Sequence, residues 1–217
     1  MGDFRIKTCP VGQIGTNCYV LYRKNDEEQK KAVIIDPGAN GAFLLNKFHE
    51  LGVVPEAILL THGHFDHILA ITDIKRAFPD TKLYVSELEK ELLEDPQINL
   101  SVNFGHPYSA KGDVFIKDGD KLSIAGIDFS VIATPGHTAG SVCFWIEDEQ
   151  VLMSGDTLFL ESLGRTDLAT GSQAEIIKSI KERLFVLPED TMVYPGHGEP
   201  TTIEHEKQNN PVAHYRG

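Results

Sequence analysis

The chain has 217 residues, of which 41% are hydrophobic and 24% are charged, as in ordinary globular domains. This composition argues against a disordered, collagen-like or coiled-coil protein, and a formal net charge of -12 makes the chain a poor default partner for nucleic acid or anionic membranes. No apolar run approaches the roughly 18 residues that span a bilayer, no signal peptide is visible, and three cysteines do not form a disulfide framework. We therefore expect a soluble cytoplasmic protein that binds neither nucleic acid nor membranes.

The first half of the chain alternates short apolar strands with amphipathic helices. Strands are predicted at 17–22, 31–35, 57–60 and 82–85, and the first two form a hairpin. Three helices are predicted: one after a capping Asn40 with Leu44, Leu45, Phe48 and Leu51 on its apolar face, one over 67–78, and one that begins at a capping box of Ser86 and Glu89 and ends before Pro96. The segment 95–112 has no clear period and is expected to be a long loop.

The second half begins with a strongly β pattern. Strands are predicted at 113–117, 121–125, 127–133, 141–147, 150–154 and 192–194. A helix over 173–186 is expected to be capped by Ser172 and Glu175, and Thr201 and Glu204 are expected to cap a terminal helix. Because no linker separates the two halves, the pattern favours two sheets packed as one layered α/β domain over two independent domains.

Three buried strands each run into a tight turn that carries histidine. The turns are Thr61-His62-Gly63-His64, Thr134-Pro135-Gly136-His137 and Tyr194-Pro195-Gly196-His197. Loops at the ends of strands are where rigid scaffolds place their chemistry. We therefore expect these turns to meet at a functional site.

The first of these turns opens a dense cluster of metal-ligand side chains. His62, His64, Asp66 and His67 lie within six residues, and Gly63 permits tight backbone geometry between the first two. Imidazole and carboxylate are natural ligands for zinc, iron or manganese. A polar turn whose histidines cap a helix is the alternative, but such clustering by chance is rare. The cluster therefore predicts a metal site.

The other candidates gain weight only in combination. His137 and His197 could each be a turn residue, and Asp156 could simply be an N-cap. His49, His106, His205 and His214 are expected on the surface. Together, five histidines and two aspartates suit two divalent metals, with His62, His64 and His137 on one, Asp66, His67 and His197 on the other, and Asp156 as a bridge.

These motifs, in this order, resemble the metallo-β-lactamase superfamily over residues 11 to 211. The resemblance implies a four-layer αββα sandwich, and we expect residues 1–217 to form this one domain. Within the superfamily the chain is most similar to the glyoxalase II group, the hydroxyacylglutathione hydrolases. The segments that carry this likeness are Gly12 to Tyr19, Thr134 to Ser141, Gly155 to Phe159, Gly164 to Asp167 and His205 to Pro211. The C-terminal helical substrate domain of the longer members is not expected here.

This likeness implies hydrolysis of an anionic thioester such as S-lactoylglutathione by a hydroxide that bridges two metals, with zinc as the expected metal and iron or manganese as alternatives. Asp66 is then the candidate catalytic residue, since it would bind metal and hold the hydroxide in position. The Lys and Tyr substrate positions of the group are not matched, and Arg165 stands near them. Arg165 could pair with a carboxylate of the thiol part or with Asp167, and Lys207 and Asn210 are weaker substrate-binding candidates.

Other functions suit parts of the same pattern. A persulfide dioxygenase of the same fold would use one iron on His62, His137 and Asp156. A nuclease is disfavoured by the acidic balance and a secreted β-lactamase by the lack of a signal peptide. A catalytically silent metal-binding protein is disfavoured because all seven ligand positions are filled.

Overall fold

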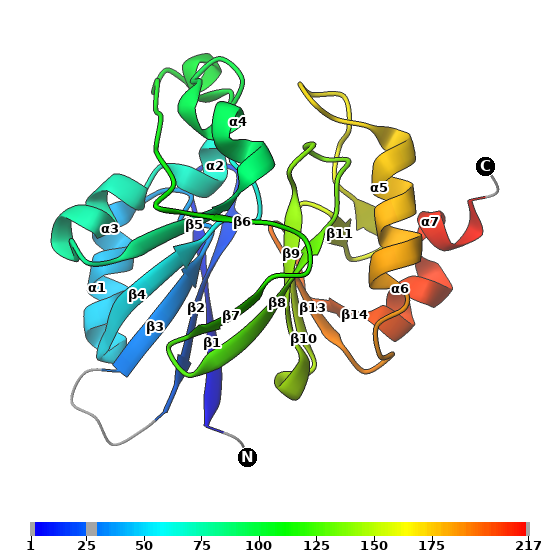
Figure 1. Cartoon of the computed structure of the whole chain (residues 1–217), viewed down its shortest axis with the longest axis horizontal. Helices are drawn as coiled ribbons and strands as arrows, with labels where there is room; N and C mark the ends of the chain where they lie inside the picture. The colour runs from blue at the N-terminus through cyan, green and yellow to red at the C-terminus, as the bar shows by residue number, and fades with distance from the viewer. Residues whose placement is uncertain (1–2, 25–29, 216–217) are drawn as a thin grey trace.

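The computed structural model describes residues 3–24 and 30–215, which form two six-stranded sheets with helices on their outer faces (Figure 1). The first sheet has the order β1-β2-β3-β4-β5-β6. Its strands are Phe4–Val11, Thr16–Arg23, Lys30–Ile35, Val53–Leu59, Lys82–Ser86 and Val114–Ile116. Strands β1 to β3 pair antiparallel, and β3 to β6 pair parallel.

The second sheet has the order β14-β13-β10-β9-β8-β7. Its strands, in chain order, are Lys121–Ile124 (β7), Ile127–Ala133 (β8), Val142–Ile146 (β9), Val151–Gly155 (β10), Met192–Pro195 (β13) and Thr201–Thr202 (β14). Only β10 and β13 pair parallel. A separate hairpin joins β11 (Leu158–Phe159) to β12 (Ser162–Leu163).

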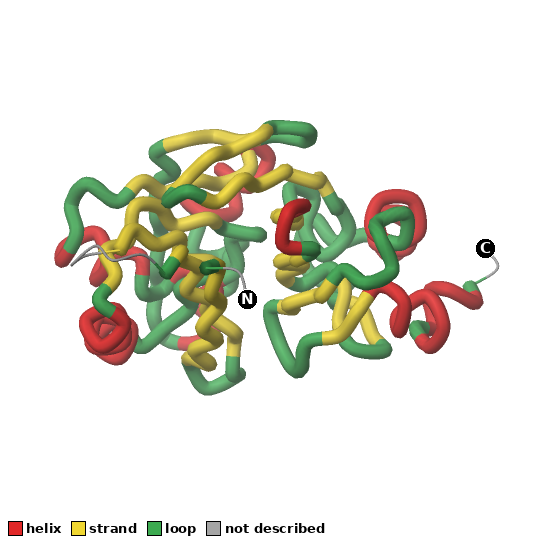
Figure 2. Tube along the Cα trace, turned by 90° about the horizontal axis from the view of Figure 1, so that it is seen from below, coloured by secondary structure: helices red, strands yellow, loops and turns green. Residues whose placement is uncertain are grey.

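Helices cover the outer face of each sheet (Figure 2). On the first sheet lie α1 (Gly41–Leu51) and α3 (Ile71–Ala77), and near its edge α2 (Phe65–Ile68) and α4 (Lys90–Glu94). On the second lie α5 (Gln173–Ser179), α6 (Ile203–Asn209) and α7 (Pro211–His214). In the described part of the chain, none of these helices combines the length and apolar character needed to cross a bilayer.

Side-chain alternation along the strands divides the core into three layers. In β2, Cys18 and Val20 pack toward α1 and α3, whereas Tyr19 and Leu21 pack between the sheets. In β9, Cys143 packs toward the helices of the second sheet. Successive side chains of a strand point to opposite faces of its sheet. Strands β2 and β9 are buried on both faces, so each needs the other sheet on one side and helices on the other. The predicted αββα sandwich is therefore confirmed.

Several predicted helix boundaries differ in the structure. The helix expected over 67–78 is two helices, α2 and α3, because the N–H of Ala70 donates to the carbonyl of Pro37 instead of continuing the first helix. The helix expected over 173–186 changes to a π turn over Ile180–Leu184, where the N–H of Phe185 donates to Ile180. Apolar side chains of both segments remain buried, Ile68, Ile71 and Ile74 in the first and Ile176, Ile180 and Leu184 in the second.

Three predicted caps also act differently. Asn40 stands at the N-cap of α1, but its side chain accepts from the N–H of Gly12 at 2.7 Å rather than from the helix. Ser86 caps the turn that leads into α4, while Glu89 points inward and does not complete a capping box. Thr202, not Thr201, caps α6, since its hydroxyl accepts from the N–H of His205.

The sequence pattern missed one long strand and several short elements. Strand β1 lies at the edge of its sheet, where only two of its eight residues are fully buried and Pro10 is tolerated, so it shows no clear apolar pattern. The short elements β11, β12, β14 and α7 have two to four residues each, too few for a periodic signal. Part of the loop predicted to join the first hairpin, residues 25–29, lies outside the described residues.

Candidate metal centre

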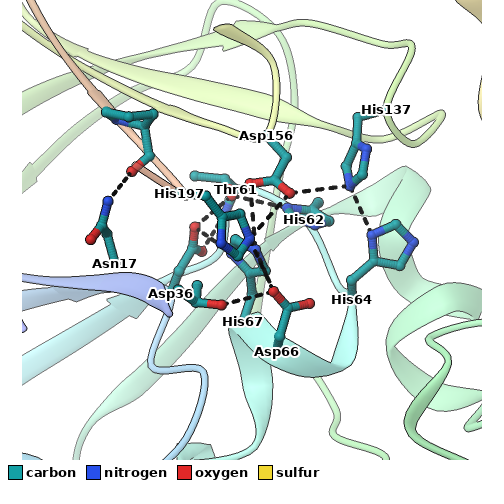
Figure 3. Close-up of polar contacts among 12 residues, drawn as sticks. Asn17, Asp36, Thr61, His62, His64, Asp66, His67, His137, Asp156 and His197 are labelled. Carbon is teal, nitrogen blue, oxygen red and sulfur yellow. Dashed lines mark hydrogen bonds and ion pairs between the residues drawn. The ribbon is translucent and has the colours of Figure 1, made fainter. Parts of the chain in front are cut away.

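The seven predicted ligands meet where strands from both sheets end (Figure 3). His62 and His64 follow β4, and Asp66 and His67 lie in α2. The other three follow strands of the second sheet: His137 after β8, Asp156 after β10 and His197 after β13. The structure thus brings together side chains that are up to 135 positions apart in the sequence, from His62 to His197.

The first group of ligands, which we call the three-histidine group, consists of His62, His64 and His137. Their ring centroids are 4.7–4.8 Å apart, and the rings meet edge to face. Nδ1 of His64 lies 2.9 Å from Nε2 of His137. All three side chains are buried. One nitrogen of each ring therefore faces a common point.

The second group, which we call the carboxylate group, consists of Asp66, His67 and His197. Oδ2 of Asp66 lies 3.3 Å from Nε2 of His67 and 3.2 Å from Nε2 of His197. His67 is fully buried, whereas the His197 side chain is 27% exposed. This group is therefore the more open side of the centre.

Asp156 lies between the two groups. Its Oδ1 is 3.5 Å from Nε2 of His67, and its Oδ2 is 3.6 Å from Nε2 of both His137 and His197. A carboxylate in this place can offer one oxygen to each group, as the bridging role requires.

The protonation of the ligand rings follows from their outer contacts. The hydroxyl of Thr61 donates to Asp36 at 2.6 Å, so at its 3.2 Å contact with Nδ1 of His62 it must accept, which places a proton on Nδ1. Nδ1 of His137 donates to the carbonyl of Arg165 at 2.8 Å. In both rings the inward Nε2 therefore carries a lone pair, as a metal ligand must.

Two further polar residues support the carboxylate group. Oδ2 of Asp36, which follows β3, lies 3.0 Å from Nδ1 of His67, and the same side chain accepts from the N–H of Thr61. The hydroxyl of Thr16 donates to Oδ2 of Asp66 at 2.8 Å. The Asp36 contact fixes the ring of His67 and raises its basicity, whereas the Thr16 contact fixes the direction of the Asp66 carboxylate.

Glu89 ties together the two loops that carry the three-histidine group. It is buried, and its two carboxylate oxygens accept from the N–H of Gly63 at 2.8 Å and from the N–H of Gly140 at 2.9 Å. Burial raises the pKa of Glu89, while these N–H groups and Thr138 act in the opposite direction. One carboxylate therefore sets the spacing between the His62–His64 turn and the loop after His137.

Two glycines allow close approach at the centre. A Cβ at Gly196 would lie 2.1 Å from Oδ1 of Asp156, and a Cβ at Gly155 would lie 2.3 Å from the hydroxyl of Thr61. Gly155 also has a φ of +50°, which side chains rarely adopt. Larger residues at these places would displace Asp156 or Thr61.

The charge of the two groups differs. Burial lowers the pKa of His62 and His137, and it lowers the pKa of His64 to about 3. Burial would also lower the pKa of His67, but Asp66, Asp156 and Asp36 outweigh it and raise that pKa well above the usual value. The three-histidine group is therefore neutral, and the carboxylate group has a net attraction for cations.

The donor set fits divalent metal ions. Nε2 of His62, Nε2 of His67 and Oδ1 of Asp156 are buried and have no hydrogen-bond partner among the described residues. Buried polar atoms are normally paired, and such a cluster of imidazole and carboxylate atoms is typical of a metal site. The described residues form three sets of candidate ligands: His62, His64 and His137; His62, His67 and Asp156; and Asp66, His67 and His197.

The predicted substrate-binding residues lie farther out. The guanidinium of Arg165 is exposed and pairs with both carboxylate oxygens of Asp167 at 2.7 and 2.8 Å, the structural alternative considered from the sequence, while its carbonyl holds His137. Lys207 pairs with Glu189 at 2.7 Å. Its role in substrate binding stays a prediction.

Asn210, the third predicted substrate-binding residue, makes its hydrogen bonds within the fold, and its binding role stays a prediction. It is fully buried, its amide donates to Ser162 and Glu206, and its side-chain oxygen caps α7 through the N–H of Val212. These contacts use its polar atoms within the fold and leave none of them at the surface.

Sequence reasoning missed Thr16, Asp36, Thr61 and Glu89 as parts of the site. Asp36 carried a usable signal, because it ends a strand that neighbours β4 in the parallel part of the sheet. The carboxyl ends of neighbouring parallel strands lie at one edge, so a polar residue there is a candidate. Glu89 carried no such signal, since its partners come from two distant loops.

Sequence comparisons agree with the motif pattern. The sequence profile of the metallo-beta-lactamase superfamily matches residues 11–197. A probable metallo-hydrolase of Streptococcus pyogenes is 39% identical over 92% of this chain and 86% of its own length. The hydroxyacylglutathione hydrolase GloC of Haemophilus influenzae is 33% identical over 95% of this chain and 96% of its own length.

Solved structures share the fold over nearly the whole chain. The B3 metallo-beta-lactamase BLEG-1 matches with a TM-score of 0.89 and 41% identity, covering 95% of this chain and 98% of its own. TTHA1623, solved in a di-iron-bound form, matches with a TM-score of 0.83 and 33% identity over 94% and 98%. ETHE1 of Myxococcus xanthus matches with a TM-score of 0.79 and 27% identity over 98% and 86%.

Proposed function

Since the chain belongs to the metallo-beta-lactamase superfamily, we propose that it is a metal-dependent hydrolase that cleaves a thioester whose thiol part is anionic. The reaction adds water to the thioester carbonyl and breaks the C–S bond, so that a carboxylic acid and a thiol leave. The proposed cofactors are two divalent ions, with zinc expected and iron or manganese compatible with the same ligands.

One observation carries this proposal: two ligand groups, each complete by itself, share Asp156. The carboxylate group has three ligand atoms within 4.8 Å of one another, and so has the three-histidine group. A centre for one metal would need only one of these groups. Two ions, when bound, would supply an activated water and polarise the substrate carbonyl.

The residues of this chain orient that chemistry. Asp66 is held by the hydroxyl of Thr16 at Oδ2, so its carboxylate has one fixed direction at the open side of the centre. We propose that it binds metal and positions the attacking water. His137 is held by the carbonyl of Arg165, which keeps its ring nitrogen directed inward during turnover.

The anionic thiol part has a candidate partner in Arg165. Its carbonyl contacts His137, so its side chain begins next to the three-histidine group. A guanidinium can exchange the carboxylate of Asp167 for that of a substrate with the same bidentate geometry. The similarity to GloC supports a hydroxyacylglutathione as the first thioester to test.

The decisive measurement is a metal count per chain on the native protein, paired with hydrolysis of S-lactoylglutathione by the same preparation. We expect two divalent ions and release of glutathione that is lost after chelation and restored by adding metal. A β-lactam serves as a second substrate because of the similarity to BLEG-1. Full thioester hydrolysis by chelated protein, or hydrolysis of the β-lactam alone, would reject the proposal.

A mononuclear-iron persulfide dioxygenase is the second candidate function. Asp156 lies 3.6 Å from His137, and His62 and His137 face the same point, so one iron could use these three residues. The likeness to ETHE1 is compatible with this function. Oxygen uptake with glutathione persulfide separates the two candidates: if only oxygen is consumed and no thioester is cleaved, the hydrolase proposal fails.

A further inference from the structure

A groove of about 280 Å³ opens beside Asp66, and we call it the Phe104 groove. It lies between the turn from β1 to β2, the start of α1, helix α2 and the segment after α4. Its apolar walls are formed by Ile14, Ala39, Phe65, Leu69 and Phe104, with Asp66 and His106 as the ionisable members. Because Asp66 belongs to both the groove and the carboxylate group, the groove lies directly beside the metal centre.

An aromatic pair forms one wall of the groove. The rings of Phe65 and Phe104 stack with centroids 4.0 Å apart and planes 21° apart. Phe65 stands between the ligands His64 and Asp66, and its N–H donates to the carbonyl of Asn99. The loop that carries Phe104 is fixed further, because the side chain of Asn99 binds Ser101 and Tyr108. The aromatic wall is thus tied to the helix that carries Asp66.

The opposite wall is also held in place. The N–H of Gly12 in the β1–β2 turn donates to the side chain of Asn40. Gly38 packs so closely on α2 that a Cβ there would lie 1.5 Å from the carbonyl oxygen of Asp66. Ile14 at the tip of the turn is 49% exposed and Phe104 is 50% exposed, so both leave apolar surface at the mouth.

The charge of the lining indicates which part of a thioester fits. Among the residues that the structure describes, no lysine or arginine lines the groove, and the Asp66 carboxylate would repel an anion. The anionic thiol part therefore belongs elsewhere, as the proposed role of Arg165 requires. A cavity of about 150 Å³ with apolar walls can hold benzene, so a groove of about 280 Å³ has room for an aromatic ring.

We propose that the Phe104 groove binds the acyl part of the substrate and selects large apolar acyl groups, aryl or branched, over small ones. This inference rests on the proposed thioester hydrolysis and adds the substrate class. Asp66 and the aromatic pair then place the acyl carbonyl at the metal centre, because the ring and the carboxylate belong to adjacent residues, Phe65 and Asp66.

The test compares S-phenylacetylglutathione with S-acetylglutathione, which share the thiol part and differ only in the acyl group. We expect the metal-loaded protein to prefer the phenylacetyl thioester by about 10-fold to 100-fold in kcat/KM, the range for apolar groups in a fitted pocket. Phe104→Ala should remove most of that preference, because it should lower kcat/KM for the phenylacetyl thioester far more than for the acetyl thioester. Phe115→Ala is the matched control, since Phe115 is 46% exposed on β6, outside the groove.

Equal rates for both thioesters in the unmodified protein, or an equal loss for both in Phe104→Ala, would overturn the groove proposal while leaving the proposed function intact. Ile14→Ala at the opposite wall gives the same test if Phe104→Ala does not fold. If no thioester is cleaved at all, the proposed function fails, and binding of phenylacetate against acetate still tests the groove. Binding of phenylacetate that Phe104→Ala abolishes and Phe115→Ala retains supports the groove; equal binding by all three proteins rejects it.

Discussion

His64 and His67 are three residues apart, both are buried, and their pKa values move in opposite directions. Burial brings the pKa of His64 to about 3, whereas Asp66, Asp156 and Asp36 overcome burial and raise the pKa of His67 well above its usual value. The same side chain on the same segment thus belongs to a neutral group or to a charged group according to the carboxylates near it. The lesson is that the placement of three aspartates, rather than burial, makes the two halves of the centre different.

The strongest way to break this comparison is to remove the carboxylate that belongs to one group only. Asp66→Ala should lower kcat/KM for the thioester by about 10³-fold or more, because several kcal/mol of metal-assisted stabilisation depend on its site. The fold should persist, because the three-histidine group does not depend on Asp66. Circular dichroism checks this expectation. His205→Ala, which removes an exposed pair with Glu161, is the control. Undiminished activity of Asp66→Ala would contradict the two-group arrangement.

Acidification should separate the groups next. The pKa values of His67 and His197 are raised, so without metal both rings keep their protons up to a higher pH. When the pH falls below these raised values, a metal ion must displace the protons in order to bind. The lowered pKa values of the three-histidine group delay this competition to far lower pH. Affinity at the carboxylate group should fall about tenfold for each pH unit, first reducing the metal count to one per chain.

Metal content after dialysis at a series of pH values measures this order. The remaining ion should be retained by Asp66→Ala across the same series, because that variant keeps the three-histidine group. Parallel loss of both ions from the unmodified protein would show that the two groups do not differ in the way their pKa values indicate.

Changing a residue that contacts a candidate ligand, without itself being one, should have a smaller effect on the metal centre. Asp36→Asn keeps the shape of the side chain but removes the charge that faces His67, and we expect metal affinity to fall by about 10-fold to 100-fold. Thr16→Val removes only the hydrogen bond to Asp66 and is the matched variant for the carboxylate group. Chelator competition measures the metal affinity of both variants. Unchanged affinity of Asp36→Asn would show that Asp36 does not support the metal centre.

Glu89→Gln addresses the three-histidine group in the same way. An amide cannot accept from both Gly63 and Gly140, so one buried N–H loses its partner, at a cost of about 1–3 kcal/mol. The melting temperature should fall by about 2–12 °C, and metal affinity should fall at the three-histidine group. Glu87→Gln, on the exposed side of the same turn, is the control. Equal melting temperatures of the two variants would show that Glu89 does not hold the two loops.

The smallest effect is expected at the surface. Arg165→Ala should raise KM for the anionic thioester about two-fold to five-fold with kcat unchanged, the size of an exposed ion pair. Lys207→Ala, which breaks a pair with Glu189 and removes the weaker candidate, should raise KM less than Arg165→Ala does. Steady-state kinetics at low salt distinguish them, and an effect of Lys207→Ala equal to that of Arg165→Ala would assign the thiol part to a different surface.

The convergence of the candidate ligands could be predicted from the sequence because the segments that carry them each follow a buried strand. His62, His64, Asp66 and His67 are neighbours in the sequence, and His137 and His197 repeat the Pro-Gly-His pattern. The layers of the fold could be predicted for the same reason, since the strands in the middle of the sheets are continuous apolar runs. The edge strand β1 lacked this signal.

The support of the site could not be predicted, because it depends on contacts between distant segments. Glu89 fitted a local capping pattern with Ser86, yet its carboxylate is used by Gly63 and Gly140. Asn210 fitted a family pattern for substrate binding, yet its amide joins α6 to α7 and to Ser162. A polar residue near the end of a helix has several possible partners, and only the tertiary structure selects one of them.

The arrangement of the ligands has a mechanical consequence. The three-histidine group takes His62 and His64 from a loop of the first sheet and His137 from a loop of the second. An ion held there would fasten the two sheets to each other at one rim, while Cys9, Cys18 and Cys143 are free thiols that contribute no cross-link. Loading the centre would therefore act as a reversible clasp, which resists the opening of one sheet against the other and stabilises the folded chain by mass action.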